Sequence, residues 1–294
     1  MWKLTLVVLA TTAAAVACAD PDRSTGVQPD NAATLDQNAV NTASLPDLIV
    51  DSKSTQNNWL VRVEDFPADF CSVQEGGVQP GTHTVIRFTV TTPNIGVGDL
   101  RIGDPNVHVA ANDGLYEFAS CHNHYHFKHY ALYELVDPTS GYVWKAAKRG
   151  FCMLDTDPNP AYLGEPAKTW QFRSCGAVGI PGNQGISHGW ADTYRFYLGG
   201  QFFVLDGGDG QPPVPPGTYM LRITVNPPYA PDKKGVCPRV KDPATGLCHQ
   251  FEESSYSNNQ RSVLINIPDH PGRDGVGPLK DQKALDYEPA EHDQ

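Results

Sequence analysis

The chain has 294 residues and a formal net charge of −11 at pH 7. A chain of this length fits one large domain or two small ones. The acidic balance argues against nucleic acid as a partner, because nucleic-acid binding needs a basic surface.

Residues 1–18 have the layout of an export signal. Lys3 precedes an apolar run from Leu4 to Ala17, and small residues stand directly before Cys18. The run is too short to span a bilayer securely, and no later segment is apolar for long enough. We therefore expect an exported chain. It is either secreted after cleavage by an ordinary signal peptidase or kept at the cell envelope as a lipoprotein, with a lipid on Cys18 as its contact with the membrane.

Two polar segments flank the central part of the chain. Residues 19–44 are polar, small and free of aromatic side chains, which predicts a flexible linker. Residues 269–294 have a similar composition and are expected to form a polar C-terminal tail. We place a single domain between them, at residues 45–268.

The central part contains short runs rich in β-branched and aromatic residues, separated by clusters of Gly, Pro, Asn and Asp. The predicted strands are 48–50, 83–91, 130–136, 193–198, 202–205, 218–225 and 261–267. No persuasive helical period of any length is present. With 27 Gly and 25 Pro, the pattern predicts an all-β fold, a β-sandwich with long loops held by disulfides.

The cysteines bear on these loops. Without Cys18, six of the seven remain, an even number suited to three disulfides in an oxidising compartment. The short spacing of Cys237 and Cys248 predicts a local disulfide that closes an irregular insertion.

Residues 120–130, SCHNHYHFKHY, hold four of the ten histidines. His122, His124 and His126 alternate, so an extended backbone turns all three side chains to one face. Imidazole nitrogens without thiolates favour copper or zinc. The outer two Cα atoms of a straight strand would lie about 13 Å apart, so we expect a bend that brings the rings together.

His129 breaks this alternation. It is either a fourth ligand or a residue that orients one of the three ligands, and we favour the orienting role. A site with three protein ligands leaves a coordination position open, which is typical of a catalytic metal. A zinc hydrolase would need a carboxylate beside the histidines to activate water, and residues 120–130 contain none.

Several further motifs occur in a fixed order around the histidines. They are LPDL at 45–48, CHNHYH at 121–126, KRGFCMLD at 148–155, QGIS at 184–187, DTY at 192–194, PGTY at 216–219, VNP at 225–227 and YSNN at 256–259. This ordered set resembles the lysyl oxidase family over about residues 45–268. The resemblance implies a lysyl oxidase-like catalytic domain that binds copper through His122, His124 and His126.

The resemblance also implies an amine oxidase with a cofactor made from its own chain, lysine tyrosylquinone. By position, Lys148 and Tyr194 correspond to the two parent residues, and Lys145 is the rival lysine. Such an enzyme converts a primary amine, either a protein lysine or a small amine, and molecular oxygen into an aldehyde, hydrogen peroxide and ammonia. Asp192 is a candidate base for the substrate proton, with a structural carboxylate as the equal alternative.

Family members carry a calcium site that joins the two ends of the domain. The positions that match it are Asp47, the backbone carbonyl of Leu48, Glu253, Asn258 and Asn259, all oxygen donors that suit calcium. Ser255 stands where the family has an acid, which weakens the expectation of calcium.

The resemblance also bears on the disulfides. By family position Cys121 pairs with Cys175, which leaves Cys71 to pair with Cys152.

A non-catalytic, exported β-sandwich that binds copper or zinc is the main alternative function. Such a protein has no need of Lys148 and Tyr194, so this pair discriminates between the two. The resemblance leaves the amine substrate open.

Overall fold

The computed structural model describes residues 44–148, 150–159 and 170–273. The predicted export signal, the predicted linker apart from Ser44, and the predicted tail beyond Arg273 lie outside the described residues, so these remain predictions. Within the described ranges, no helix is both long and apolar enough to cross a membrane.

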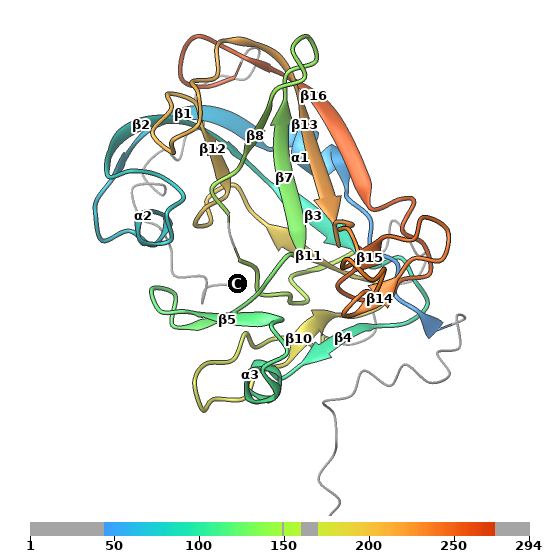
Figure 1. Ribbon diagram of the computed structural model, residues 1–294. Coiled ribbons are helices and arrows are strands. Elements are labelled where there is room, and N and C mark those ends of the chain that lie inside the picture. Colours follow the sequence, from blue (N-terminus) through green and yellow to red (C-terminus); the bar gives the residue numbers. More distant parts are fainter. Residues whose placement is uncertain (1–43, 149, 160–169, 274–294) are drawn as a thin grey trace, which may run out of the picture. The chain divides into compact units, whose positions relative to one another are not determined.

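Strands dominate the described residues, and the helices are short (Figure 1). The helices are α1 (Ser52–Asn57), α2 (Cys71–Gln74) and α3 (Pro105–Ala111). The strands are β1 (Trp59–Phe66), β2 (Gly81–Phe88), β3 (Val90–Pro93), β4 (Leu100–Gly103), β5 (Tyr116–Ala119), β6 (His124–Phe127), β7 (Ala131–Val136), β8 (Val143–Lys145), β9 (Asp157–Pro158), β10 (Gln184–Ile186), β11 (Trp190–Tyr194), β12 (Phe202–Val204), β13 (Gly217–Val225), β14 (Val240–Lys241), β15 (Cys248–His249) and β16 (Gln260–Ile267). The predicted all-β fold is confirmed.

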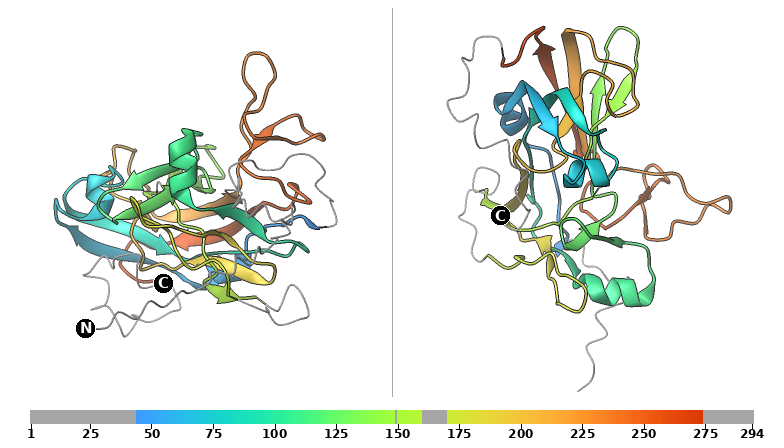
Figure 2. Two further views of the ribbon diagram at one scale, coloured as in Figure 1. Left: turned by 90° about the horizontal axis from the view of Figure 1, so that it is seen from below. Right: turned by 90° about the vertical axis from the view of Figure 1, so that its left-hand side faces the viewer.

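Two antiparallel sheets face each other across the main core (Figure 1, Figure 2). One sheet has the strand order β1-β2-β12 and the other has the order β16-β13-β7-β8. Phe88 of β2 and Tyr133 of β7 meet edge to face between them, with ring centres 5.4 Å apart. A third sheet, β3-β11-β9, and the hairpin β5-β6 extend the fold towards the histidine segment.

The alternation of side chains along the strands produces this core. In β13 Tyr219, Leu221 and Ile223 are buried, while Thr218 is exposed. In β16 the burial alternates in the same way, and Leu264 on its outer face is 65% exposed. The two C-terminal runs, predicted as strands from their β-branched and aromatic residues, are therefore strands in the structure.

Three predicted strands differ from the structure. The run 48–50 forms no strand, because only Leu48 makes an isolated bridge, with Asn94. The run 83–91 is divided at Thr89 between two sheets, because β2 pairs with β1 whereas β3 pairs with β11. The predicted strand 193–198 is wrong beyond Tyr194, where the chain enters a turn closed by the Leu198 N–H donating to the Arg195 carbonyl. The guanidinium of Arg87 donates to two carbonyls of that turn.

The sequence reading missed β1 and the short helices. Arg62 and Glu64 interrupt the apolar pattern of β1, yet both are buried in an ion pair. Helix α3 had a readable start signal, because the Asp104 side chain accepts a hydrogen bond from the Asn106 N–H and Pro105 occupies the first turn.

The disulfides correct two predictions. Cys71 pairs with Cys121, and Cys152 pairs with Cys175, so the predicted pairs Cys121–Cys175 and Cys71–Cys152 are wrong. The turn of the β5-β6 hairpin brings Cys121 to Cys71 of α2. Cys152 instead follows Phe151, which pairs with Phe127 at the edge of β6 opposite β5. The predicted disulfide between Cys237 and Cys248 is present.

Candidate metal and amine oxidase site

The three alternating histidines form a buried cluster. His124 and His126 lie on β6, whereas His122 lies in the turn before it. Asn123 has a φ of 57°, and this left-handed residue supplies the expected bend. The three ring centres lie 5.0 to 5.6 Å apart, and each histidine is no more than 4% exposed. Buried imidazoles at this spacing are suited to one metal ion.

The edge of β6 that does not pair with β5 is held by backbone hydrogen bonds. The N–H of Phe127 donates to the Phe151 carbonyl at 2.6 Å, and the N–H of Tyr125 donates to the Gly176 carbonyl at 3.0 Å. Gly150 lies directly against the His126 ring, because a Cβ at this position would come within 2.4 to 2.6 Å of the His126 side chain. The chain at Gly150 therefore packs on the histidine cluster.

Glu75 is a site residue that the sequence reading missed. Its Oε1 lies 3.2 Å from Nε2 of His122, and donor atoms of Glu75, His122 and His126 lie within 4.8 Å of one another. Burial acts to raise the pKa of Glu75, but the hydrogen bond from His122 and nearby cationic side chains lower it more, so its pKa falls below the ordinary value. A correct pairing of Cys71 with Cys121 would have pointed to it, because Glu75 follows Cys71 by one helical turn.

Lys148 and Tyr194 lie side by side. Nζ of Lys148 is 4.8 Å from the centre of the Tyr194 ring. The Tyr194 hydroxyl accepts a hydrogen bond from the Cys152 N–H at 2.6 Å and donates to the Cys152 carbonyl at 2.8 Å, which fixes the ring. Tyr194 is 1% exposed. The rival Lys145 is exposed on β8, where its backbone N–H and carbonyl bond the Gln211 side chain.

Two other predicted site residues lie at different depths. Asp192 is completely buried on β11. Burial of the neighbouring Tyr130 is the main cause that raises the pKa of Tyr130, and the charge of Asp192 raises it further. The Tyr130 hydroxyl lies 2.5 Å from Oγ1 of Thr92. His129 is exposed in the turn after β6 with a φ of 62°, so its ring is not among the buried rings of the cluster.

The residues of the predicted calcium site also gather in space. Nδ2 of Asn258 donates to Asp47 at 2.8 Å, and Nδ2 of Asn259 donates to Glu253 at 2.8 Å. The N–H of Leu48 donates to the other oxygen of Glu253 at 2.6 Å. Burial raises the pKa of Glu253 to about 8, although these N–H donors act in the opposite direction. Both carboxylate oxygens of Glu253 thus already accept hydrogen bonds, and calcium remains a prediction.

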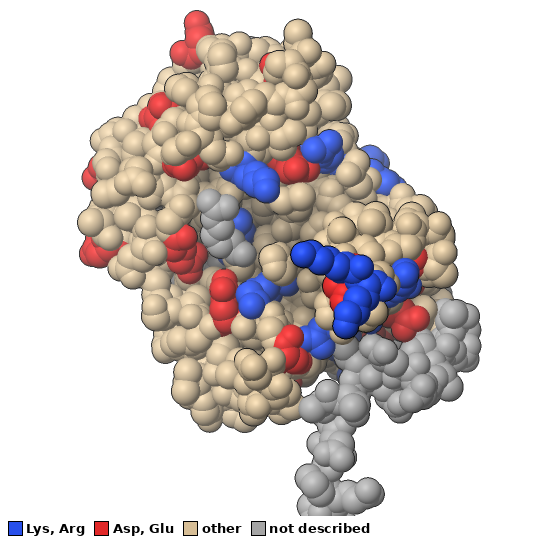
Figure 3. All heavy atoms as spheres, in the orientation of Figure 1, with Lys and Arg blue, Asp and Glu red and all other residues tan. Residues whose placement is uncertain are grey.

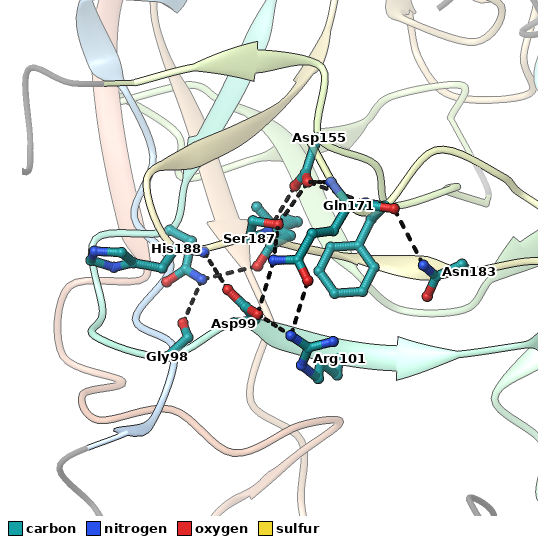
Figure 4. Close-up of polar contacts among 11 residues, drawn as sticks. Gly98, Asp99, Arg101, Asp155, Gln171, Asn183, Ser187 and His188 are labelled. Carbon is teal, nitrogen blue, oxygen red and sulfur yellow. Dashed lines mark hydrogen bonds and ion pairs between the residues drawn. The ribbon is translucent and has the colours of Figure 1, made fainter. Parts of the chain in front are cut away.

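Two of the recognised motifs have a structural role (Figure 4). Asp155 is 1% exposed and accepts hydrogen bonds from the N–H and hydroxyl of Ser187, both at 2.7 Å. It also accepts from the N–H groups of Gln171 and Phe172. Gln171 in turn donates to Asp99, so hydrogen bonds join the segments that contain Asp99, Asp155 and Gln171.

Charged side chains of both signs lie on the face of the molecule seen in Figure 1. Figure 3 shows a hollow in the middle of the face seen in Figure 1, with Lys and Arg side chains at its edge and Asp and Glu side chains around it. This face therefore lacks the uniformly acidic surface that a net charge of −11 alone would suggest.

Comparisons with known proteins agree with this arrangement. The sequence profile of the family described as Lysyl oxidase matches residues 67–234. Protein-lysine 6-oxidase of Sus scrofa is 29% identical over 238 residues, covering 77% of this chain and 78% of the relative. The Homo sapiens protein of the same name is 29% identical over 197 residues, covering 63% of this chain and 42% of the relative.

The chain spans less than half the length of several of these relatives. Protein-lysine 6-oxidase of Gallus gallus is 27% identical over 197 residues, which cover 63% of this chain but only 41% of the relative. Among solved structures, a CARDB domain from Pyrococcus furiosus matches with 10% identity over 79% of this chain and all of that domain, at a TM-score of 0.22, which is too low to carry an inference. The profile match covers more than half of the 294 residues, and the chain belongs to the lysyl oxidase family.

Proposed function

We propose that this chain is a copper-dependent amine oxidase. It would convert primary amines, as protein lysine side chains or small amines, to aldehydes with molecular oxygen, releasing hydrogen peroxide and ammonia. The observation that carries the proposal is the 4.8 Å between Nζ of Lys148 and the Tyr194 ring centre. The similarity to protein-lysine 6-oxidases supports the reaction class.

The chemistry of the donors fits a copper ion. His122, His124 and His126 offer three imidazole nitrogens in a buried place, and imidazole suits copper and zinc. When bound, copper would supply the oxygen chemistry that oxidises the Tyr194 ring. Gly150 packs on His126 two residues after Lys148, which supports a site that combines the histidines with Lys148.

The chain itself would fix the geometry of cofactor formation. The two hydrogen bonds with Cys152 hold the Tyr194 ring in one orientation, and the Lys148 amine lies over its face. Burial of the ring excludes water from it. An amine held against a ring in this way reacts as if at high local concentration, so the expected product is lysine tyrosylquinone formed from Lys148 and Tyr194.

Asp192 is our candidate for the group that accepts the substrate proton. It lies two residues before Tyr194 on the same strand, so both side chains leave β11 on the same side. The proposal includes primary amines as the substrate class and calcium at the predicted site. We expect the enzyme to be secreted or held at the cell envelope, as residues 1–18 predict.

A zinc hydrolase is the second candidate, because the structure brings a carboxylate to the histidines. Glu75 supplies the group that residues 120–130 lack. A hydrolase would not need Lys148 beside Tyr194, so the pair still favours the oxidase.

Peroxide release tests the proposal. Copper-loaded full-length protein should form hydrogen peroxide when given a lysine-containing peptide or a small primary amine. Tyr194→Phe and Lys148→Ala should abolish peroxide formation, and Lys145→Ala should retain it because Lys145 is exposed and away from the ring. Undiminished peroxide from Tyr194→Phe, or no peroxide from fully copper-loaded protein with any amine, would refute the oxidase.

A further inference from the structure

We propose that Glu75 is a ligand of the metal at the histidine cluster and that the Cys71–Cys121 disulfide holds it there. This inference rests on the metal centre of the proposed function and adds a donor from a different part of the chain. The carboxylate comes from the end of α2, 47 residues before His122 in the sequence, and its Oε1 lies 3.2 Å from the His122 Nε2.

The distance between the two donor atoms is close to that of neighbouring ligands on one ion. Two ligands about 2.1 Å from a tetrahedral metal are separated by about 3.4 Å. The Glu75 and His122 atoms are 3.2 Å apart, and the corresponding donor atom of His126 lies within 4.8 Å of both. A mixed nitrogen and oxygen donor set of this kind suits copper and zinc.

The local fold explains why a glutamate stands at this place. Helix α2 begins at Cys71, and the Glu75 N–H donates to the Cys71 carbonyl at 2.8 Å, so the two residues are one turn apart. Cys71 is bonded to Cys121, which directly precedes His122. The disulfide therefore fixes the distance between the carboxylate and the first histidine.

Two glycines hold the other side of the turn. Gly76 has a φ of 75°, which ends the helix directly after Glu75. A Cβ on Gly77 would lie 2.9 Å from the Cβ of Ala147, so this turn packs against the residue before Lys148. Glu75 is thus held between the histidines and the Lys148 segment, with 26% of its side chain exposed.

Metal affinity and the spectrum of bound copper test the ligand role. The full-length protein is titrated with Cu(II), and separately with Zn(II), against a competing chelator, and the Cu(II) form is examined by electron paramagnetic resonance. Glu75→Gln should bind copper about tenfold or more weakly and show an altered copper spectrum. Glu117→Gln is the matched control, because Glu117 faces His126 across the β5-β6 pair but is exposed, and it should leave both readouts unchanged.

The outcomes separate this inference from the proposed function. If Glu75→Gln binds copper as the natural chain does, or loses affinity with an unchanged copper spectrum, Glu75 is not a ligand, even where peroxide formation proves the oxidase. If Glu75→Gln alters affinity and spectrum in a protein that never forms peroxide, the ligand role stands and the oxidase fails.

A thermodynamic cycle tests whether the Cys71–Cys121 disulfide holds Glu75 at the metal. The double variant Cys71→Ser with Cys121→Ser should bind copper more weakly than the natural chain. Adding Glu75→Gln to this double variant should lower its copper affinity little further. The matched pair is Cys237→Ser with Cys248→Ser, whose disulfide lies in the insertion and should not affect copper. If the losses of copper affinity from opening the disulfide and from Glu75→Gln are fully additive, the disulfide does not hold Glu75 at the metal. Should the Cys71 and Cys121 variant fail to fold, the natural chain is partially reduced and alkylated, the opened disulfide is identified by mass mapping, and copper is titrated after the reductant has been removed.

Discussion

At the scale of single residues, buried polar side chains keep the loops around the site in shape. Asp155 accepts four hydrogen bonds from three residues, including both from Ser187. A hydrogen bond to a buried charge is worth about 1.5 to 3 kcal/mol, whereas an exposed one is worth much less. Asp155 and Ser187 themselves therefore serve loop geometry and not the reaction.

Ser187→Ala should lower the free energy of unfolding by about 1.5 to 3 kcal/mol, because it removes one hydrogen bond to the buried Asp155. Ser140→Ala is the matched control, since it removes the same kind of bond, to Asp137, in an exposed turn and should cost no more than about 0.5 kcal/mol. Denaturant unfolding of both variants measures the difference. Equal losses would contradict the structural role of Asp155.

Gly150→Ala should weaken copper binding about tenfold or more, because the added Cβ would displace the His126 ring. Gly208→Ala is a comparable clash, since its Cβ would lie 2.2 Å from the ring of His83, a histidine outside the cluster. Chelator competition should show normal copper affinity for the Gly208 variant. Unchanged affinity of the Gly150 variant would show that this glycine does not position His126.

The sequence pointed to the three histidines that the structure brings together, but not to the carboxylate beside them. The alternation of His122, His124 and His126 is visible in eleven consecutive letters, as is the need for a bend. Glu75 is remote in sequence, and the wrong pairing of Cys71 hid its position beside His122. His129 was expected to orient a ligand because it breaks the alternation, and in the structure it is exposed in a left-handed turn.

At the scale of elements, a buried ion cluster joins β1 to β2. Glu64 of β1 lies 2.8 Å from Arg62 Nε and 2.7 Å from Arg87 Nη2, with all three side chains at most 9% exposed. Arg87 also holds the turn after β11, so the cluster links this sheet to the strand that carries Tyr194. Strand β1 could not be predicted from the sequence, because charged residues such as Arg62 and Glu64 are typical of a solvent-exposed face.

Glu64→Gln should destabilise the fold by about 3 to 5 kcal/mol, because it leaves two buried guanidinium groups without a compensating charge. Glu134→Gln, which breaks the less buried pair with Arg222 between β7 and β13, should cost about 1 kcal/mol or less. Chemical denaturation of the two variants gives the comparison. A Glu64 variant as stable as the Glu134 variant would contradict the account of β1.

At the scale of the whole domain, polar contacts join segments near its two ends. Leu48 and Glu253 are bonded across 205 residues, and Asp47 is bonded to Asn258 across 211. Burial also raises the pKa of Asp47, with the hydrogen bond from Asn258 acting in the opposite direction. Such long-range closure follows from the tertiary fold, and the sequence could predict it only through the family resemblance.

The stability of the metal-free protein should fall as pH rises from about 5 to about 8. Glu253 has a pKa of about 8 in the folded chain and an ordinary carboxyl pKa near 4.5 in the unfolded chain, so the folded state holds a proton that the unfolded state releases. The loss is at most about 1.4 kcal/mol per pH unit. Unfolding in a chelator at several pH values measures this slope.

Glu253→Gln should lack this part of the slope, because its side chain does not titrate. If the predicted calcium site exists, calcium should stabilise the ionised Glu253 and remove the slope from the natural chain as well. The same slope in the natural chain and in Glu253→Gln would show that Glu253 is not the responsible group. A slope that calcium does not alter would refute calcium at this place.

The central claim is that Lys148 and Tyr194 become one cofactor, and peptide mass mapping of copper-loaded, aerated protein tests it most directly. We expect a covalent link between the peptides that contain Lys148 and Tyr194, with the mass of the quinone adduct. The link should be absent from Lys148→Ala and Tyr194→Phe and present in Lys145→Ala. Unmodified Lys148 and Tyr194 in protein that is fully loaded with copper would contradict the account.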